Sequence, residues 1–234
     1  MKILITGSSG FIGGELVKHL EQKHEIITYD SNEGNDILDY GKLKEVMGGC
    51  DVVVHTAAIK KPLEDKTFAD YFSINCTGTF NVAQACLENG VKKLIYLSSS
   101  SYYGIEKGIP EPSSITESEP ILTQKFKVSD VSCRDCDIAY STSKVIAEQI
   151  LANYGLTKKF QVIMLRFGPT RPKGVHKPFG KLNLHLKIEN AIQALENAIN
   201  TNKELWYEAF TIMDDKLEGV DISKAKELLN YRPK

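Results

Sequence analysis

The stretch KILITGSSGFIGGEL, residues 2–16, decides the fold of this chain. Its mainly apolar first five residues lead into a loop with Gly7, Gly10 and Gly13, and apolar residues at helical spacing follow. In such a strand–turn–helix unit the glycines let the backbone turn tightly, approach a pyrophosphate and pack the helix close to the sheet. The helix N-terminus then faces the anion. The stretch therefore predicts an α/β fold that binds a dinucleotide, rather than an incidental glycine turn.

The same alternation of strand and helix patterns continues through the rest of the sequence. Apolar strands are expected at residues 2–6, 25–30, 51–58, 92–100, 160–167 and 210–213. Helices are expected at residues 11–22, 67–89, 140–154, 186–200 and 221–230, with a short one around Leu43, Val46 and Met47. Continuously apolar strands separated by helices indicate a parallel sheet that is covered on both faces. We therefore predict a Rossmann-like α/β fold with a doubly wound parallel sheet of about seven strands.

Two segments rich in proline, glycine and charge interrupt this alternation. Residues 104–138 and 168–182 lack periodicity, and long loops of that kind within a compact domain are more often functional than idle. We expect residues 1–167 to form the dinucleotide-binding domain. Residues 168–234 are expected to form a short substrate-binding cap and closing elements that are interleaved with the main domain.

Composition limits the class of partner. The net charge of −1 on 234 residues gives no electrostatic reason to expect binding to nucleic acid or to an anionic membrane. The N-terminal apolar segment is too short for a signal peptide, and no apolar run reaches the ~20 residues of a membrane span. Five cysteines, three of them scattered, favour a reducing cytoplasm.

The pair Cys133 and Cys136 is a lone C-x-x-C. A structural zinc site needs a second pair of ligands at suitable spacing, and none follows nearby. We therefore expect no metal and interpret the pair as structural or merely exposed. A metal or redox role is the alternative.

Carboxylates follow the second expected strand at positions that suit a dinucleotide. Asp30 ends that strand, where a carboxylate accepts hydrogen bonds from the adenosine ribose hydroxyls and repels a 2′-phosphate. NAD is therefore favoured over NADP; the alternative is that Asp30 is a plain turn residue. Asp36 and Ile37 form a polar–apolar pair that we expect to hold the adenine amino group and ring.

Tyr140 and Lys144 are spaced i and i+4, so they share one face of an expected helix. A free phenol has a pKa near ~10 and is a poor base at neutral pH. A neighbouring ammonium stabilises the phenolate and lowers that pKa, so the tyrosine can take a proton from a substrate hydroxyl. Lys144 can also hold the nicotinamide ribose. The preceding strand ends in LSSSSYYG, residues 97–104, and brings several hydroxyls to the same edge of the sheet.

These features occur in the order glycine loop, acidic strand end, serine strand end and Tyr-x-x-x-Lys. In that order the chain resembles the short-chain dehydrogenase/reductase superfamily and, within it, the extended NAD-dependent epimerase/dehydratase family. The resemblance covers nearly the whole sequence. It extends over TGSSGFIG (6–13), HTAA (55–58), NCTGTFNV (75–82), LRFG (165–168) and the closing DISKAKELLNYRPK (221–234).

The resemblance implies a set of site residues. The catalytic residues would be Tyr140, Lys144 and Ser99, which is counted back from Gly104, with Ser100 as the fallback. Expected cofactor contacts are Gly7, Gly10, Phe11, Ile12, Gly13, Asp30, Asp36, Ile37, Thr56, Ala57, Ala58, Asn75, Tyr140 and Lys144. Asn75 also has a structural place that supports the active site. Expected substrate contacts are Ser99, Ser100 and Arg171.

Two segments depart from the family pattern. The loop between Ser99 and Tyr140 is longer than the family usually shows, and its extra part, residues 123–137, is either a lid beside the active site or a surface insertion. The region after LRFG is shorter than the substrate domain of nucleotide-sugar epimerases. Its basic residues, among them Arg171, either meet a phosphate or carboxylate or form a solvated loop.

The predicted function is NAD-dependent epimerisation of a sugar, expected on a nucleotide sugar, by transient oxidation at a sugar carbon. The family also implies a homodimer built from the helices near 67–89 and 140–154. The compact C-terminal region keeps a second enzyme in view, a sugar or uronate dehydrogenase that releases NADH. A non-catalytic NAD-sensing protein is the alternative from another class, and the complete Ser–Tyr–Lys set argues against it. A dehydratase is disfavoured, because the acidic pair usual after the strand serine is replaced here by Ser100 and Ser101.

Overall fold

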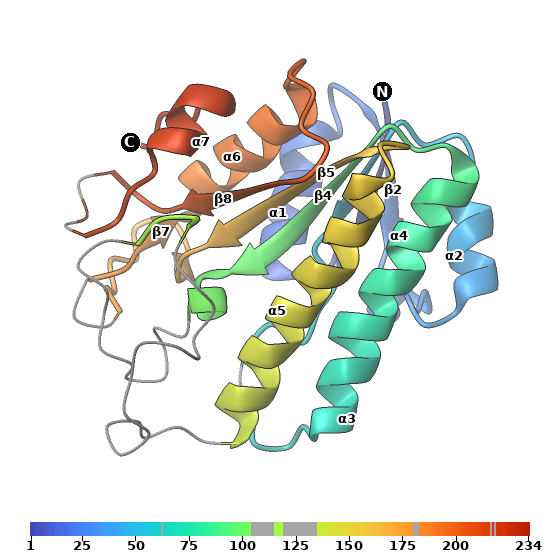
Figure 1. Ribbon diagram of the computed structural model, residues 1–234, viewed down its shortest axis with the longest axis horizontal. Helices are drawn as coiled ribbons and strands as arrows, with labels where there is room; N and C mark the ends of the chain where they lie inside the picture. The colour runs from blue at the N-terminus through green and yellow to red at the C-terminus, as the bar shows by residue number, and fades with distance from the viewer. Residues whose placement is uncertain (62, 104–114, 119–134, 180–182, 216, 218) are drawn as a thin grey trace.

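The structure is a computed structural model, and it describes residues 1–61, 63–103, 115–118, 135–179, 183–215, 217 and 219–234. Its described part contains a sheet of six strands in the order β2-β1-β3-β4-β5-β8, in which every neighbouring pair is parallel (Figure 1). The strands are β1 (Lys2–Thr6), β2 (Glu25–Tyr29), β3 (Val52–His55), β4 (Lys93–Ser99), β5 (Gln161–Phe167) and β8 (Glu208–Ile212). The predicted doubly wound parallel sheet is confirmed, with six strands rather than about seven.

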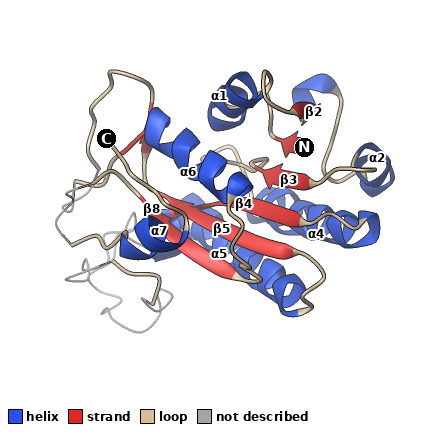
Figure 2. Cartoon of the chain, turned by 90° about the horizontal axis from the view of Figure 1, so that it is seen from above, coloured by secondary structure: helices blue, strands red, loops and turns tan. Residues whose placement is uncertain are grey.

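Helices cover both faces of this sheet (Figure 2). They are α1 (Phe11–Leu20), α2 (Tyr40–Val46), α3 (Phe68–Tyr71), α4 (Gly78–Asn89), α5 (Asp135–Leu156), α6 (Ile188–Asn200) and α7 (Ser223–Leu228). Buried side chains of α1, α6 and α7 share one core with one face of the sheet, and those of α2, α4 and α5 share another with the opposite face. Because both faces are covered, β3 and β4 are buried along nearly their whole length, which explains their continuous apolar sequences.

The order of the strands reverses next to β1. From β1 the chain moves outward to the edge strand β2 and then returns to the other side of β1 as β3. In open α/β sheets, ligands bind outside the carboxyl ends of the strands at such a reversal. The loops that follow β1 and β3 meet at this point, and they carry the glycine motif and HTAA.

The helix expected over residues 67–89 forms in three parts. A capping box between Thr67 and Asp70 starts α3, because each residue's side chain accepts a hydrogen bond from the other's backbone N–H. Residues Phe72–Thr77 are π-helical, and α4 continues the same direction. π-Helical turns frequently mark functional sites. Here the turn carries Asn75 into the buried layer beneath the loop after β3.

Helix α5 begins five residues before the expected start and runs from Asp135 to Leu156. Its buried face has an unusual composition, since polar and apolar side chains share it. The buried residues are Ala139, Tyr140, Ser141, Ser143, Lys144, Ala147, Glu148 and Leu151. A polar residue buried against a sheet needs partners there, so this face is the first structural indication of a site.

The C-terminal third joins the main body more closely than the expected cap. Strands β6 (Thr170–Arg171) and β7 (Leu186–Lys187) form a separate parallel pair, whereas α6 packs on the sheet and β8 extends its edge. Within the described residues, no helix is long and apolar enough to cross a membrane. The segment 123–137 lies almost wholly outside the described residues, as does Cys133, and the side chain of Cys136 is not described.

Candidate active site

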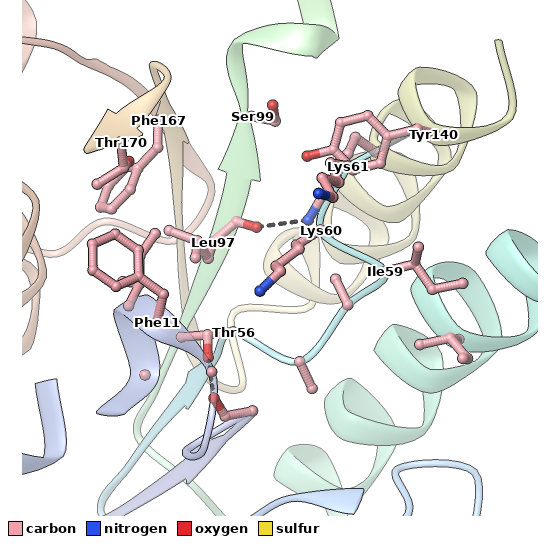
Figure 3. A pocket seen from close by; sticks show the side chains of 18 of the residues that line it. Phe11, Thr56, Ile59, Lys60, Lys61, Leu97, Ser99, Tyr140, Phe167 and Thr170 are labelled. Carbon is pink, nitrogen blue, oxygen red and sulfur yellow. Dashed lines mark hydrogen bonds between the residues drawn. The ribbon is translucent and has the colours of Figure 1, made fainter. Parts of the chain in front are cut away.

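A large open pocket lies at the carboxyl ends of the parallel strands, where the strand order reverses (Figure 3). Its volume is about 1060 Å³. Side chains and backbone from the ends of β1, β2, β3, β4 and β5 line it together with residues of α5. A cavity of this size can hold a dinucleotide and a second ligand side by side.

The glycine loop forms one wall of the pocket and leaves no room for side chains. Gly7 has a φ of 72°, and a Cβ on it would lie 2.6 Å from the backbone nitrogen of Ala57. A Cβ on Gly13 would collide with the carbonyl oxygen of Gly7. Gly10 is the N-cap of α1, and no described side chain caps the helix there. The first backbone N–H groups of α1 are therefore available to an anion such as a pyrophosphate.

Carboxylates lie at the neighbouring end of the pocket, after β2. Asp30 is 8% exposed, and its two carboxylate oxygens accept hydrogen bonds from the backbone N–H groups of Ser9 at 3.1 Å and Asn32 at 2.9 Å. These bonds hold the carboxylate at the pocket wall beside the glycine loop. Asp36 and the buried Ile37 line the same end. The Asp30 carboxylate can accept hydrogen bonds from the ribose hydroxyls of a dinucleotide, and Asp36 and Ile37 suit its adenine ring.

The loop after β3 lies under the glycine loop and is tied to β1. The Thr56 hydroxyl donates to the carbonyl oxygen of Thr6 at 2.7 Å, and the Ala57 N–H points to the Thr6 hydroxyl at 3.4 Å. Thr56, Ala57 and Ala58 all line the pocket. The small side chains keep its floor open between the glycine loop and α5.

Tyr140 and Lys144 bring α5 to the other side of the pocket. The Tyr140 ring packs edge-on against Tyr71, and its hydroxyl points from α5 toward the end of β4, where Ser99 lies (Figure 3). Lys144 Nζ donates to the Leu97 carbonyl oxygen at 2.9 Å and to the Tyr96 hydroxyl at 3.3 Å. Burial lowers the pKa of Lys144 to about 8, although the negative charge of Glu148 opposes this.

Two serines at the end of β4 complete this side of the site. The Ser99 hydroxyl donates to the Ser101 hydroxyl at 3.1 Å and accepts from the Ser101 N–H at the same distance. The Ser100 hydroxyl is buried, lines the pocket and has no hydrogen-bond partner among the described residues. A buried hydroxyl without a partner in a pocket wall is free to bind a ligand oxygen.

The family of the chain follows from a comparison of its sequence with models of known families. The model of the NAD dependent epimerase/dehydratase family matches residues 3–207. The chain belongs to this family. The resemblance seen in the sequence is thus confirmed, and the family's dependence on NAD agrees with the cofactor predicted from Asp30 and the glycine loop.

Individual members of the epimerase/dehydratase family and its structural neighbours show how far the likeness extends. UDP-glucose 4-epimerase of Bacillus subtilis is 27% identical over 208 residues, which cover 78% of this chain and 56% of that protein. L-arabinose 1-dehydrogenase of Haloferax volcanii is 29% identical over 174 residues, or 71% of this chain and 66% of that protein. The chain thus spans between about half and two thirds of these relatives.

A solved structure shares the fold over the full chain. UDP-glucuronic acid 4-epimerase from Bacillus cereus, in complex with UDP-glucuronic acid and NAD, superposes with a TM-score of 0.78 at 22% identity. The match covers 100% of this chain and 94% of that one. It supports the fold of the epimerase/dehydratase family for this chain independently of the sequence motifs.

The pocket brings together nearly all residues that the family resemblance implied. The pocket is lined by the expected residues Gly7, Gly10, Phe11, Ile12, Gly13, Asp30, Asp36, Ile37, Thr56, Ala57, Ala58, Ser99, Ser100, Tyr140, Lys144 and Arg171. Asn75 is different, because it lies beneath the pocket and is 1% exposed. Its amide accepts from the Ile59 N–H at 2.8 Å and donates to the Ser143 hydroxyl at 2.9 Å. Asn75 thereby joins the loop after β3 to α5.

The sequence analysis did not identify three lysines that line the pocket after β3. Lys60, Lys61 and Lys66 follow β3 and line the pocket. Lys60 and Lys61 are exposed, and no described carboxylate pairs with either. The pocket therefore has carboxylates at the Asp30 end and cations near Tyr140. The sequence KKPLEDK, directly after the HTAA motif, is the pattern that could have revealed them.

Proposed function

We propose that this chain is an NAD-dependent epimerase that acts on a nucleotide sugar by transient oxidation at a sugar carbon. The observation that carries the proposal is the meeting of Ser99, Tyr140 and Lys144 at one side of a pocket whose other side fits a dinucleotide. A protein that only sensed NAD would have no use for this second, substrate-facing set of groups. Family membership and the likeness to UDP-glucose 4-epimerase support the same assignment.

Each residue has a distinct part in this chemistry. When bound, NAD supplies a hydride acceptor that can later return the hydride to the sugar. Tyr140 takes the proton from the sugar hydroxyl as the carbon is oxidised and gives it back on reduction. The Lys144 ammonium stabilises the phenolate form of Tyr140 and holds the nicotinamide ribose. Ser99 hydrogen-bonds to the reacting sugar oxygen and fixes its position relative to Tyr140.

The charges of the pocket support an anionic substrate. Lys60, Lys61, Lys66 and Arg171 line it, against the carboxylates of Asp30, Asp36 and Asp137. Lysine and arginine side chains bind phosphate oxygens, so the four cations suit a nucleotide diphosphate. We assign residues 168–187, with Arg171, to the substrate-binding cap, and the rest of the C-terminal region to closing elements of the NAD-binding domain.

A dehydrogenase is the second candidate, and the likeness to L-arabinose 1-dehydrogenase favours it. An epimerase returns the hydride to the sugar, whereas a dehydrogenase releases NADH at every turnover. The test is stoichiometric: candidate nucleotide sugars and free sugars are incubated with the protein while product and NADH are followed. Product without net NADH supports the epimerase. NADH that accumulates in proportion to consumed substrate would overturn the epimerase and establish the dehydrogenase.

We further propose a homodimer in the cytoplasm. Large apolar side chains of α3, α4 and α5 are exposed, namely Phe68, Phe80, Ile138 and Leu156, and α4 and α5 lie side by side (Figure 1). Pairing of these helices with those of a second copy would cover them. Cys50, Cys76 and Cys86 are buried free thiols, which suits a reducing compartment. Light scattering on the wild type and on Phe80→Glu tests the dimer, since the added charge is expected to yield monomers.

A further inference from the structure

Two buried groups beneath the pocket hold Lys144. Tyr96 of β4 is 1% exposed, and its hydroxyl accepts an N–H from Lys144 Nζ at 3.3 Å. A second N–H of Lys144 is bound by the Leu97 carbonyl at 2.9 Å. An ammonium has three N–H donors, so one remains for the pocket, which Lys144 lines.

The direction of the hydrogen bonds around Thr79 follows from counting donors and acceptors. The Thr79 hydroxyl donates its one hydrogen to the Asn75 carbonyl at 2.6 Å. It therefore accepts from its other partner, His55 Nε2, which lies 3.0 Å away. The ring of His55 packs against the ring of Tyr96, its partner in the β3–β4 register, with 5.5 Å between the centroids. The oriented His55 ring thus helps to fix the ring that carries the Tyr96 hydroxyl.

The second partner of His55 lies next to the glycine loop. His55 is fully buried, and burial together with the charge of Lys144 lowers its pKa to about 3, so the ring is neutral. Because Nε2 donates to Thr79, Nδ1 accepts from the Thr6 hydroxyl at 2.7 Å. Thr6 directly precedes Gly7. The His55 ring that packs against Tyr96 is therefore held from both sides, by Thr79 and by the residue that precedes the glycine loop.

We propose that Tyr96 is a positioning residue of the catalytic site, whose hydroxyl holds the Lys144 ammonium so that its third N–H faces the pocket. The proposal rests on the role given to Lys144 and Tyr140 in the proposed function. A hydroxyl oxygen that accepts a hydrogen bond from an ammonium favours the charged form of the lysine. An ammonium with two fixed partners also keeps a defined direction for its third donor.

The charged and titratable groups around Lys144 come from four elements. They are Tyr140 and Glu148 on α5, Cys76 in the π-helical turn, His55 on β3 and Tyr96 on β4. Glu148 and Cys76 favour the ammonium through space, and the neutral His55 adds no charge. Of these groups, Tyr96 is the one with a hydrogen bond to Nζ, so its hydroxyl can be removed without changing any charge.

The variant Tyr96→Phe tests the proposal because it keeps the aromatic ring, whose centroid lies 4.9 Å from Nζ, and removes the acceptor. We expect NAD to bind about fivefold to tenfold more weakly by calorimetry, the weight of one ordinary hydrogen bond. With the ammonium less well held, the Tyr140 phenolate is stabilised less, so the pKa of Tyr140 should rise by about half to one unit. The tyrosinate absorbance of the protein, compared with the same background carrying Tyr140→Phe, reports that titration.

A matched control is Tyr231→Phe. Tyr231 is also fully buried and donates one hydrogen bond, to the Met213 carbonyl at 3.0 Å, but does not line the pocket. It should lose stability without changing NAD affinity or the titration of Tyr140. Wild-type NAD affinity and an unshifted titration in folded Tyr96→Phe would overturn the proposal.

A second pair of variants covers the case in which Tyr96→Phe does not fold. Thr79→Val removes the acceptor that orients His55, whose ring packs against Tyr96, and Thr79→Ser retains the hydroxyl. NAD binding is expected to weaken in the valine variant and to stay near the wild type in the serine variant; equal affinities would refute the proposal. Because neither readout uses a sugar, these outcomes do not depend on whether the chain is an epimerase.

Discussion

Two buried cations near the same helix are treated in opposite ways. Arg166 of β5 is bound by Glu148 of α5, to which its guanidinium donates at 2.7, 3.0 and 3.2 Å. Lys144 lies one helical turn before Glu148, and its ammonium meets the neutral Leu97 carbonyl and Tyr96 hydroxyl. None of the described carboxylates forms an ion pair with Lys144.

The two environments move the pKa values in opposite directions. Burial lowers the pKa of Lys144 to about 8. Burial also opposes the charge of Arg166, but the hydrogen bonds and the negative charge of Glu148 outweigh it and raise the pKa of Arg166. A paired cation is a fixed structural charge, whereas a desolvated cation without a carboxylate stays close to titration and available for chemistry. The comparison thus separates a structural pair, Arg166 and Glu148, from the residues proposed to act on the substrate, Lys144 and Tyr140.

The largest expected effect is on turnover. Tyr140→Phe removes the hydroxyl proposed to transfer the proton, so turnover should fall by about two to four orders of magnitude, the range of general acid–base groups. The fold and NAD binding should remain, because the ring and its contact with Tyr71 persist. Steady-state kinetics and calorimetry on the same preparation measure both. Near-normal turnover would exclude the phenol as the proton-transfer group.

In the structural pair, Glu148→Gln should instead destabilise the protein. It leaves the Arg166 charge buried without its partner, and breaking a buried pair in this way costs about 3–5 kcal/mol of unfolding free energy. Urea unfolding measures the loss. The control is Lys144→Met, which removes a buried cation that has no carboxylate partner and should leave stability unchanged or raise it. Equal losses in the two variants would contradict the distinction between the cations.

The pH dependence of stability sharpens the same comparison. The folded-state pKa of Lys144, about 8, lies below the ordinary value of 10.5, so below pH 8 both states are charged and burial of the ammonium destabilises the fold. Between these values the folded state loses its proton first. The unfolding free energy of the wild type should then rise relative to Lys144→Met, by on the order of 2–3 kcal/mol.

Unfolding curves of both proteins at a series of pH values across that range provide the measurement. The difference between the wild type and Glu148→Gln should stay level over the same range, because Arg166 keeps its charge. A level difference for Lys144→Met as well would mean that the lysine is not desolvated in solution.

The smallest expected effect concerns a buried anion, Asp30. Like Lys144 it is bound by neutral groups, the backbone N–H groups of Ser9 and Asn32, and it lines the pocket. Asp30→Ser should weaken NAD and relieve repulsion of the NADP phosphate, moving the ratio of the two affinities by about tenfold, or ~1.4 kcal/mol. Binding titrations with both cofactors decide it. An unchanged ratio would make Asp30 a turn residue only.

The features that lie close together in the sequence were predictable. The glycine loop, Asp30 at the end of β2, the serines at the end of β4 and the i, i+4 pair on α5 depend on local periodicity and on the position of each residue within its element. A parallel sheet with short loops then brings the carboxyl ends of the strands together. The strand count was less well predicted, because β8 joins the main sheet through contacts with distant elements.

The sequence by itself determined the fold and the cofactor and predicted the catalytic set, since each rests on a pattern within a few residues. Only the tertiary structure decided which of these groups are paired and which are not. Arg166 and Glu148 are 18 residues apart, Tyr96 and Lys144 are 48, and Asn75 and Ser143 are 68. No local pattern specifies such pairs, because they form when strands and helices pack and water is excluded. Since desolvation sets the pKa of Lys144, the chemistry of the site is a property of that packing.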